Sequence, residues 1–142
     1  MKKKLDCVLL VDDDEMTNFI NQTVIERADV ANKIDVALDG QEALEYLTCS
    51  GKYSGTAKYP QPDLVFLDIN MPRMTGWEFL EEYKNLEADQ RANVVVIMLT
   101  TSVNPDDGTR AKSTAEVADF RQKPLNNDML MEILQQHFPY NF

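Results

Sequence analysis

The sequence predicts an α/β domain in which a doubly wound, parallel sheet of five strands is covered by helices on both faces. Three observations support this fold class. Apolar runs with strand character alternate along the chain with segments of helical periodicity, which is the pattern of βαβ units. Several of these runs are apolar at nearly every position, as in strands that are buried on both faces. The length of 142 residues is typical of one domain, so a single sheet accounts for the whole chain.

Five runs of strand character predict the strands. In chain order they are Asp6–Val11, Lys33–Leu38, Leu64–Leu67, Val94–Leu99 and Ala118–Gln122. Val94–Leu99 is the strongest strand, because every position is apolar and four of its six residues are β-branched. Lys33–Leu38 is weaker, because apolar and polar residues alternate along it.

Side chains that recur every three or four positions predict the helices between the strands. They are Met16, Phe19, Ile20, Thr23 and Val24 in the first helix, Ala43, Leu44 and Leu47 in the second, Phe79, Leu80, Tyr83 and Leu86 in the third, and Leu130, Ile133, Leu134 and Phe138 in the last, which is capped near Asn126 or Asn127. The fourth helix, at about Pro105–Ala115, is mostly polar and contains a glycine. Ser50–Pro62 is longer than a usual helix-to-strand connection, and we interpret it as an insertion.

Charge and composition exclude several classes of function. The net charge of −10, from 14 basic and 24 acidic residues, argues against nucleic-acid binding, which depends on Lys and Arg. No apolar run approaches the roughly 20 residues of a membrane-spanning helix. The run after the basic first residues is too short for a signal peptide. The two cysteines and the single histidine form no zinc-binding cluster. We therefore expect a cytoplasmic protein that binds neither nucleic acid nor membrane.

Polar residues stand at the ends of four of the five predicted strands. They are Asp12, Asp13 and Asp14 after the first strand, Asp68 after the third, Thr100, Thr101 and Ser102 after the fourth, and Lys123 after the fifth. Parallel strands place these ends at one edge of the sheet, where ligands bind in this class of fold. Two carboxylates about 4 Å apart repel by roughly 4 kcal/mol at an effective dielectric of 20, so such a cluster needs a cation. Hard oxygen ligands favour Mg²⁺.

Each of these residues also has a simpler interpretation. An aspartate before a helix is a good N-cap, and a single lysine is most often a solvated surface charge. The conjunction of carboxylates, hydroxyls and an ammonium at one edge favours a magnesium-dependent phosphoryl site over four separate structural roles.

Four segments resemble the receiver domain of two-component response regulators, and the resemblance extends from about Leu5 to Phe138. The segments are Leu10–Asp14, Phe66–Gly76, Met98–Ser102 and Phe120–Pro124. The resemblance implies a flavodoxin-like (βα)5 fold with strand order 2-1-3-4-5. It also implies a receiver domain over residues 1–142 without an output domain.

The resemblance further implies a role for each candidate site residue. Asp68 would accept a phosphoryl group from a sensor histidine kinase or a histidine phosphotransfer protein. Mg²⁺ would be held by Asp12, Asp13, Asp68 and the backbone carbonyl of Asn70. Thr100 would be the switch hydroxyl, Phe120 the switch aromatic and Lys123 the ligand of a phosphoryl oxygen, and the Lys123–Pro124 bond would be cis.

Phosphorylation would change the surface of the fourth helix, fifth strand and fifth helix, and so control binding to a downstream protein or to a second copy of the chain. We expect a switch rather than a turnover enzyme. Thr101 stands where the family more often has a smaller residue, and we expect it to slow hydrolysis. Asp14 is an additional carboxylate, interpreted as a solvated helix-start residue. The insertion resembles that of regulators paired with phytochrome-type kinases.

Two alternatives remain on the sequence alone. A phosphatase of the haloacid-dehalogenase type also forms an aspartyl phosphate, but it needs a second aspartate two residues after the nucleophile. This chain has Asn70 there, and no cap domain fits. The more serious alternative is a phosphorylation-independent docking module of the same fold.

Overall fold

The computed structural model describes residues 3–48, 62–86, 95–101, 104–123 and 125–141. They form one parallel sheet with the order β2-β1-β3-β4-β5. The strands are β1 (Val8–Val11), β2 (Ile34–Ala37), β3 (Leu64–Leu67), β4 (Val95–Thr100) and β5 (Val117–Gln122). The predicted fold class and strand order are confirmed.

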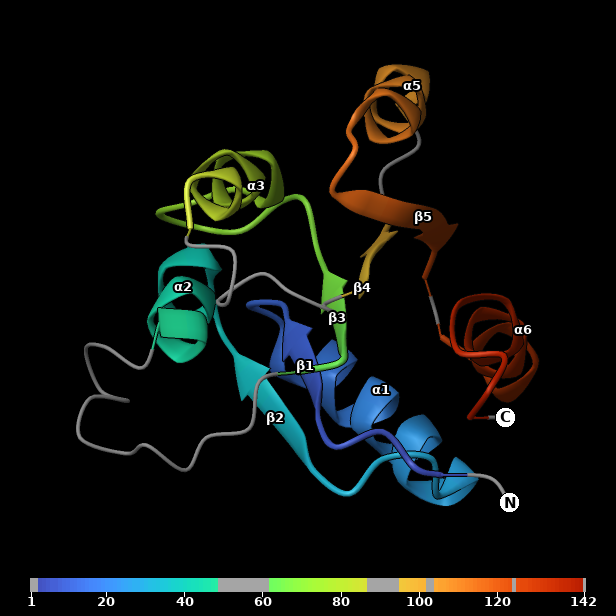
Figure 1. Cartoon of the computed structure of the whole chain (residues 1–142). Helices are drawn as coiled ribbons and strands as arrows, with labels where there is room; N and C mark the ends of the chain where they lie inside the picture. The colour runs from blue at the N-terminus through green and yellow to red at the C-terminus, as the bar shows by residue number, and fades with distance from the viewer. Residues whose placement is uncertain (1–2, 49–61, 87–94, 102–103, 124, 142) are drawn as a thin grey trace.

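Helices cover both faces of the sheet. They are α1 (Glu15–Ala28), α2 (Gly40–Thr48), α3 (Gly76–Lys84), α5 (Pro105–Ser113) and α6 (Asn127–His137). Figure 1 shows α1 and α6 on one face, and α2 and α3 on the other. Helix α5 lies next to β5, and its residue Ala111 belongs to the same core as α2 and α3. None of these helices in the described ranges is long and apolar enough to cross a membrane.

The apolar strands separate two cores, one on each face. Alternate residues of β1 belong to different cores, because successive side chains of a strand point to opposite faces. Leu9 and Val11 pack toward α2 and α3, whereas Val8 and Leu10 pack toward α1 and α6. All residues of β1 and β3 are buried, as expected for central strands, while the edge strands β2 and β5 are mostly half-buried.

Helix α1 exposes apolar side chains near its start and buries polar ones. An apolar face of a helix normally packs on the sheet, but Met16, Phe19 and Ile20 of α1 are 65%, 68% and 42% exposed. The inward side of α1 carries Asn18 and Asn21 instead, which are 5% and 4% exposed. The predicted helix is present, but the first part of its apolar face, from Met16 to Ile20, points toward solvent.

Other expectations at the ends of elements can be checked in part. Asn126 caps α6 by accepting a hydrogen bond from the Met129 N–H, as predicted. The fourth helix ends at Ser113, slightly earlier than expected. Almost all of the predicted insertion lies outside the described residues. So do the following single positions: Val94, Ser102 and Pro124 with its expected cis bond.

Candidate functional site

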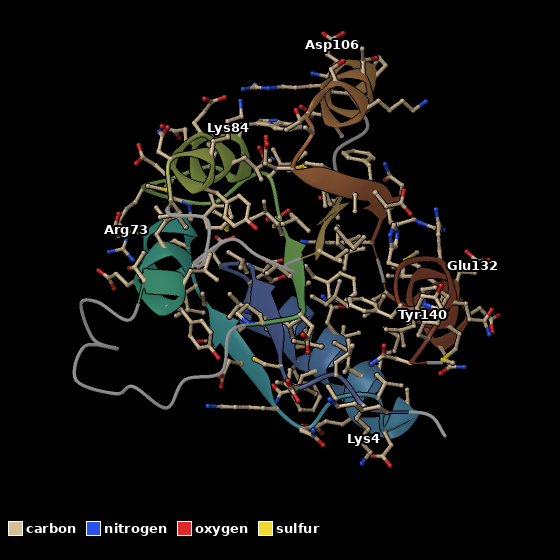
Figure 2. All side chains as sticks on the ribbon, viewed as in Figure 1. Lys4, Arg73, Lys84, Asp106, Glu132 and Tyr140 are labelled. Carbon is tan, nitrogen blue, oxygen red and sulfur yellow. The ribbon has the colours of Figure 1, made fainter. Side chains whose placement is uncertain are left out.

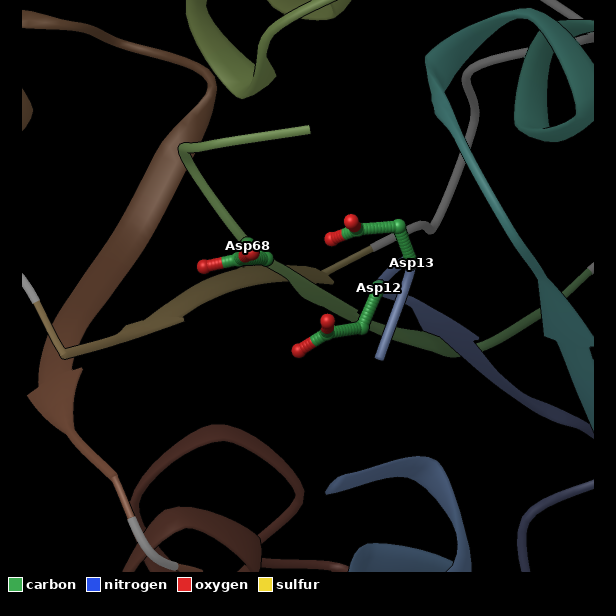
Figure 3. A group of neighbouring side chains, drawn as sticks. All are labelled: Asp12, Asp13 and Asp68. Carbon is green, nitrogen blue, oxygen red and sulfur yellow. The ribbon is translucent and has the colours of Figure 1, made fainter. Parts of the chain in front are cut away.

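Three carboxylates gather where β1 and β3 end. The two strands are neighbours with Val11 paired to Leu67, so the residues that follow, Asp12 and Asp68, emerge side by side. One carboxylate oxygen from each of Asp12, Asp13 and Asp68 lies within 4.8 Å of the others. Figure 3 shows the three side chains extending from the two strand ends toward the same side. The structure thus brings together the acidic residues that the sequence singled out.

Lys123 adds a cation to this cluster. It directly follows β5, and its backbone N–H donates to the carbonyl oxygen of Thr100 over 2.9 Å. Its Nζ donates to Asp12 Oδ2 over 2.5 Å and lies 3.4 Å from Asp68 Oδ1. One ammonium thus contacts two of the three carboxylates, and the cluster keeps an excess of negative charge.

The negative charge of Asp68 is poorly compensated. Asp68 is 7% exposed and Asp12 is 4% exposed. Burial raises the pKa of Asp68 above its usual value, the charge of Asp12 raises it further, and Lys123 lowers it. A second cation in the cluster would favour the ionised carboxylate, because opposite charge stabilises the charged form.

The donor set fits a small, hard divalent cation. Mg²⁺ prefers oxygen ligands and usually binds through few protein groups while it keeps several waters. Asp13 is exposed, so the cluster has a side that is open to solvent. Asn70, two residues beyond Asp68, is also exposed, and its backbone carbonyl is the further candidate ligand. Asp12, Asp13 and Asp68 are thus placed as they would be to hold Mg²⁺, and the role of the Asn70 carbonyl stays a prediction.

A glycine allows the backbone after Asp68 to fold tightly. A Cβ atom at Gly76 would lie 2.4 Å from the backbone carbonyl oxygen of Asp68, closer than real Cβ contacts. The Gly76 N–H donates to the carbonyl oxygen of Ile69 over 2.7 Å. Thr75 then caps α3 together with Glu78, each side chain accepting from the backbone N–H of the other. The loop therefore leaves β3 and returns directly beside the acidic cluster.

The two candidate switch residues lie on neighbouring strands. Thr100 is fully buried at the end of β4, and Phe120 is half-buried on β5, where it is paired with Met98. A hollow of about 350 Å³ lies beside Phe120, and its lining includes Gly108 and Ala111 of α5. Phe120 thus lies on the strand that α5 contacts, and Thr100 lies at the end of the neighbouring strand.

Helix α5 has a thin contact with the rest of the protein. Ala111 is the one residue of α5 that is buried, and all residues of this helix are described. The helix also contacts α3 through Trp77, whose indole N–H donates to Asp107 Oδ1 over 3.3 Å. The guanidinium carbon of Arg110 lies 4.5 Å from the centre of the same ring. Two polar contacts to one tryptophan thus supplement a small apolar interface.

The structure adds residues that the sequence analysis did not single out. Asn18 of α1 donates from Nδ2 to the backbone carbonyl of Asp12 over 2.9 Å. Within the described part of the chain its Oδ1 is buried without a hydrogen-bond partner. A cavity of about 10 Å³, close to the size of one water, is lined by residues that include Asn18, Asn21 and Asp68. In the sequence, these two buried asparagines could have been found from their spacing, because Asn18 and Asn21 are about one helical turn apart and so lie on the same side of α1.

Asp14 does not belong to the cluster. Its side chain accepts hydrogen bonds from the Met16 N–H over 3.2 Å and from the Thr17 hydroxyl over 2.7 Å. It is therefore the N-cap of α1. The interpretation of Asp14 as an exposed helix-start residue agrees with this geometry.

Comparison with known proteins identifies the family. The chain matches the family model described as response regulator receiver domain over residues 8–135. It is 35% identical over 100 residues to the response regulator Rcp1 of Synechocystis sp., an alignment that covers 70% of this chain and 65% of Rcp1, slightly less than two thirds of that relative. The Mn(2+)-bound form of Rcp1 superposes with a TM-score of 0.70 at 30% identity, over 92% of this chain and 90% of that one.

Two further solved structures that are similar to this chain are also response regulators. A two-component response regulator from Cytophaga hutchinsonii superposes with a TM-score of 0.82 at 28% identity, over 96% of this chain and 99% of that one. The phosphorylated cyanobacterial phytochrome response regulator RcpA has a TM-score of 0.72 at 29% identity, over 92% of this chain and 89% of that one. With the fold, the acidic edge and the family match in agreement, the chain belongs to the response regulator receiver domains of two-component signalling.

Proposed function

We propose that this protein is a response regulator that accepts a phosphoryl group on Asp68 from a sensor histidine kinase or a histidine phosphotransfer protein. One observation carries the proposal: the carboxylate of Asp68 lies within 4.8 Å of two other carboxylates and 3.4 Å from the Lys123 ammonium. Receiver domains as a family take phosphoryl groups from histidine kinases, and the similar regulator RcpA has been solved in a phosphorylated form.

The reaction needs a nucleophile and a way to bind negative charge. A carboxylate oxygen of Asp68 attacks phosphorus, the phosphorus–nitrogen bond to the donor histidine breaks, and the imidazole leaves with that electron pair. Lys123 is within reach of the oxygens of Asp68 and would bind a phosphoryl oxygen by a charge-assisted hydrogen bond. When bound by Asp12, Asp13, Asp68 and Asn70, Mg²⁺ supplies further positive charge to the phosphoryl group.

The phosphorylated aspartate would change the surface made by α5, β5 and α6. A phosphoryl group brings a charge of roughly −1.5 to −2 and new hydrogen-bond acceptors. In the proposed switch, Thr100 moves toward these acceptors and the half-buried Phe120 takes up the space that it leaves. The thin apolar contact of α5, with Ala111 as its buried residue, suits an element that changes position at small cost.

Exposed apolar side chains next to the site suit an approaching phosphoryl donor. Met16, Phe19 and Ile20 are exposed on α1, which begins just after Asp12 and Asp13. A hollow of about 230 Å³ is lined by residues that include Ile20 and Lys123. The donor must bring its histidine to Asp68, so it would cover this side of the molecule. The net charge of −10 makes a protein a better partner than a nucleic acid.

We propose a switch rather than a turnover enzyme. The phosphorylated state would end when water attacks phosphorus and the phosphorus–oxygen bond to Asp68 breaks, which releases inorganic phosphate. Thr101 is exposed next to Thr100, and we propose that its bulk slows this hydrolysis. The location in the cytoplasm, expected from the sequence, stays a prediction.

Intact-protein mass spectrometry after incubation with phosphoramidate and Mg²⁺ tests the proposal. We expect one phosphoryl adduct in the parent protein and none in Asp68→Asn or in EDTA. Asp14→Asn is the matched control, because Asp14 is a neighbouring acidic residue outside the cluster and asparagine also caps helices. The absence of an adduct with this and other small phosphodonors would instead support the phosphorylation-independent docking module.

A further inference from the structure

An ion pair connects the loop between β3 and α3 to the start of α2. The guanidinium of Arg73 donates to the carboxylate of Asp39. The side chain of Asp39 is 1% exposed, whereas that of Arg73 is 70% exposed. The same carboxylate accepts a hydrogen bond from the Glu42 N–H over 2.9 Å, within the first turn of α2. The buried carboxylate of Asp39 thus accepts hydrogen bonds both from the α2 backbone and from an arginine of the loop. Figure 2 shows Arg73 on the side of α2 and α3.

The next loop residue makes a second contact with the same part of α2. A Cβ atom at Gly40 would lie 2.8 Å from the sulfur of Met74, so Met74 packs directly on the glycine backbone. Two consecutive loop residues, Arg73 and Met74, therefore contact two consecutive residues at the start of α2. Arg73 has a φ of 66°, in the left-handed region that side chains other than glycine rarely adopt. The contacts to α2 hold the loop in a conformation that its sequence does not favour by itself.

The other end of this loop belongs to the site. It begins at Asp68 and runs through Asn70, and Gly76 closes it by a hydrogen bond to Ile69. Arg73 lies three residues after Asn70 and is not a member of the acidic cluster. The path of the backbone at Asn70 is therefore determined from both sides, by the closure at Gly76 and by the ion pair at Arg73.

We propose that Arg73 is a positioning residue for the cation site, and that it acts through its ion pair with Asp39. The pair keeps the loop in the conformation that presents Asn70 and Asp68 to a divalent cation. This inference rests on the proposed function only in requiring that the acidic cluster binds Mg²⁺. Groups that orient metal ligands without touching the metal commonly affect its affinity about 10- to 100-fold.

Calorimetric titration of the whole chain with Mg²⁺ tests this role. Arg73→Gly removes the guanidinium, and glycine adopts a positive φ without strain. Asp39→Asn removes the other charge and keeps a side chain that caps α2. We expect each variant to bind Mg²⁺ about tenfold more weakly, and the double variant to be no weaker than either single one, because the pair acts as a unit. Arg73→Lys is expected to restore part of the affinity, and Arg27→Ala is the control for the loss of a distant positive charge.

Unfolding midpoints in EDTA separate positioning from general stabilisation. A lower midpoint with an unchanged dissociation constant for Mg²⁺ would overturn the positioning role and leave the proposed function intact. Failure of the parent protein to bind Mg²⁺ would overturn both. Should Arg73→Gly fail to fold, Arg73→Asn is the second variant, since asparagine also tolerates the left-handed region. An affinity for Mg²⁺ equal to that of the parent in Arg73→Asn would then count against the inference.

Discussion

Replacing Asp68 by asparagine is expected to stabilise the metal-free protein. The substitution keeps the size of the side chain and removes one negative charge from the cluster with Asp12 and Asp13. A residue that is essential for the proposed reaction would thus reduce the stability of the resting fold. Such a conflict between local stability and function is expected where a site is arranged for a ligand.

The magnitude follows from the charges around Asp68. Asp12 and Asp13 have oxygens within 4.8 Å of it, and each repulsion is about 3.5 kcal/mol at an effective dielectric of 20. Lys123 at 3.4 Å contributes an attraction of about 5 kcal/mol under the same assumption. Repulsion exceeds attraction by about 2 kcal/mol, and water around the exposed Asp13 screens part of it. We therefore expect Asp68→Asn to raise the free energy of unfolding by on the order of 1–2 kcal/mol at neutral pH.

The difference in the free energy of unfolding between Asp68→Asn and the parent depends on pH. Burial, with the charge of Asp12, raises the pKa of Asp68 above the ordinary value of 3.8. Below that ordinary value the carboxyl group is protonated in both the folded and the unfolded protein, so the charge contributes nothing. As the pH rises through the raised pKa, the group ionises more readily in the unfolded chain, and the parent protein loses stability relative to the variant. The advantage of Asp68→Asn should therefore increase with pH and become constant above the raised pKa.

Urea unfolding in EDTA, followed by the fluorescence of the single tryptophan and by circular dichroism, measures this difference. The parent and Asp68→Asn are compared between pH 4 and pH 8, roughly the range in which a raised carboxyl pKa is sampled. Asp14→Asn serves as the control, because Asp14 is exposed outside the cluster. Equal stabilities of the parent and Asp68→Asn at neutral pH, or a difference that does not shrink in acid, would refute the electrostatic reasoning.

Three further substitutions test other parts of the site by urea unfolding. Gly76→Ala should destabilise the protein by about 1–3 kcal/mol, because the new Cβ would lie 2.4 Å from the Asp68 carbonyl oxygen, and an unchanged midpoint would contradict this close approach. Asn18→Ala should cost about 1–3 kcal/mol, because it leaves the buried Asp12 carbonyl without its donor; a neutral effect would mean that water replaces the amide. Phe19→Ser should change stability by less than about 0.5 kcal/mol, because Phe19 is 68% exposed, and a larger loss would show that this side chain is packed in solution.

The sheet and the acidic edge were predictable because both depend on repeated, local signals. Strands such as Leu64–Leu67 are apolar at every position, and a buried parallel strand requires no more than that. Once the strands are parallel, their carboxyl ends share an edge whatever the details of packing. This is why residues 56 positions apart in the sequence, Asp12 and Asp68, could be expected to lie together. Lys123 follows from the same rule at the end of β5.

The ion pair of Arg73 with Asp39 was not predictable in this way. The two residues are 34 positions apart, and although Asp39 follows β2, Arg73 lies within a loop and not at the end of a strand. Their contact depends on the path of a loop in which Arg73 has a positive φ, and no propensity indicates that conformation for arginine. Contacts that arise from loop geometry require the structure itself.

The exposed apolar side chains at the start of α1 and the polar site have a common physical cause. The backbone carbonyl of Asp12 is buried beside the cluster, and a buried carbonyl needs a donor. Asn18 supplies it from the first turns of α1, so the inward side of this part of the helix must be polar. The apolar residues Phe19 and Ile20 lie between Asn18 and Asn21 in the sequence, and the helical rotation turns them toward solvent. An outward apolar stripe at the start of this helix is therefore a consequence of building the acidic edge on β1, as well as a surface that a phosphoryl donor would meet.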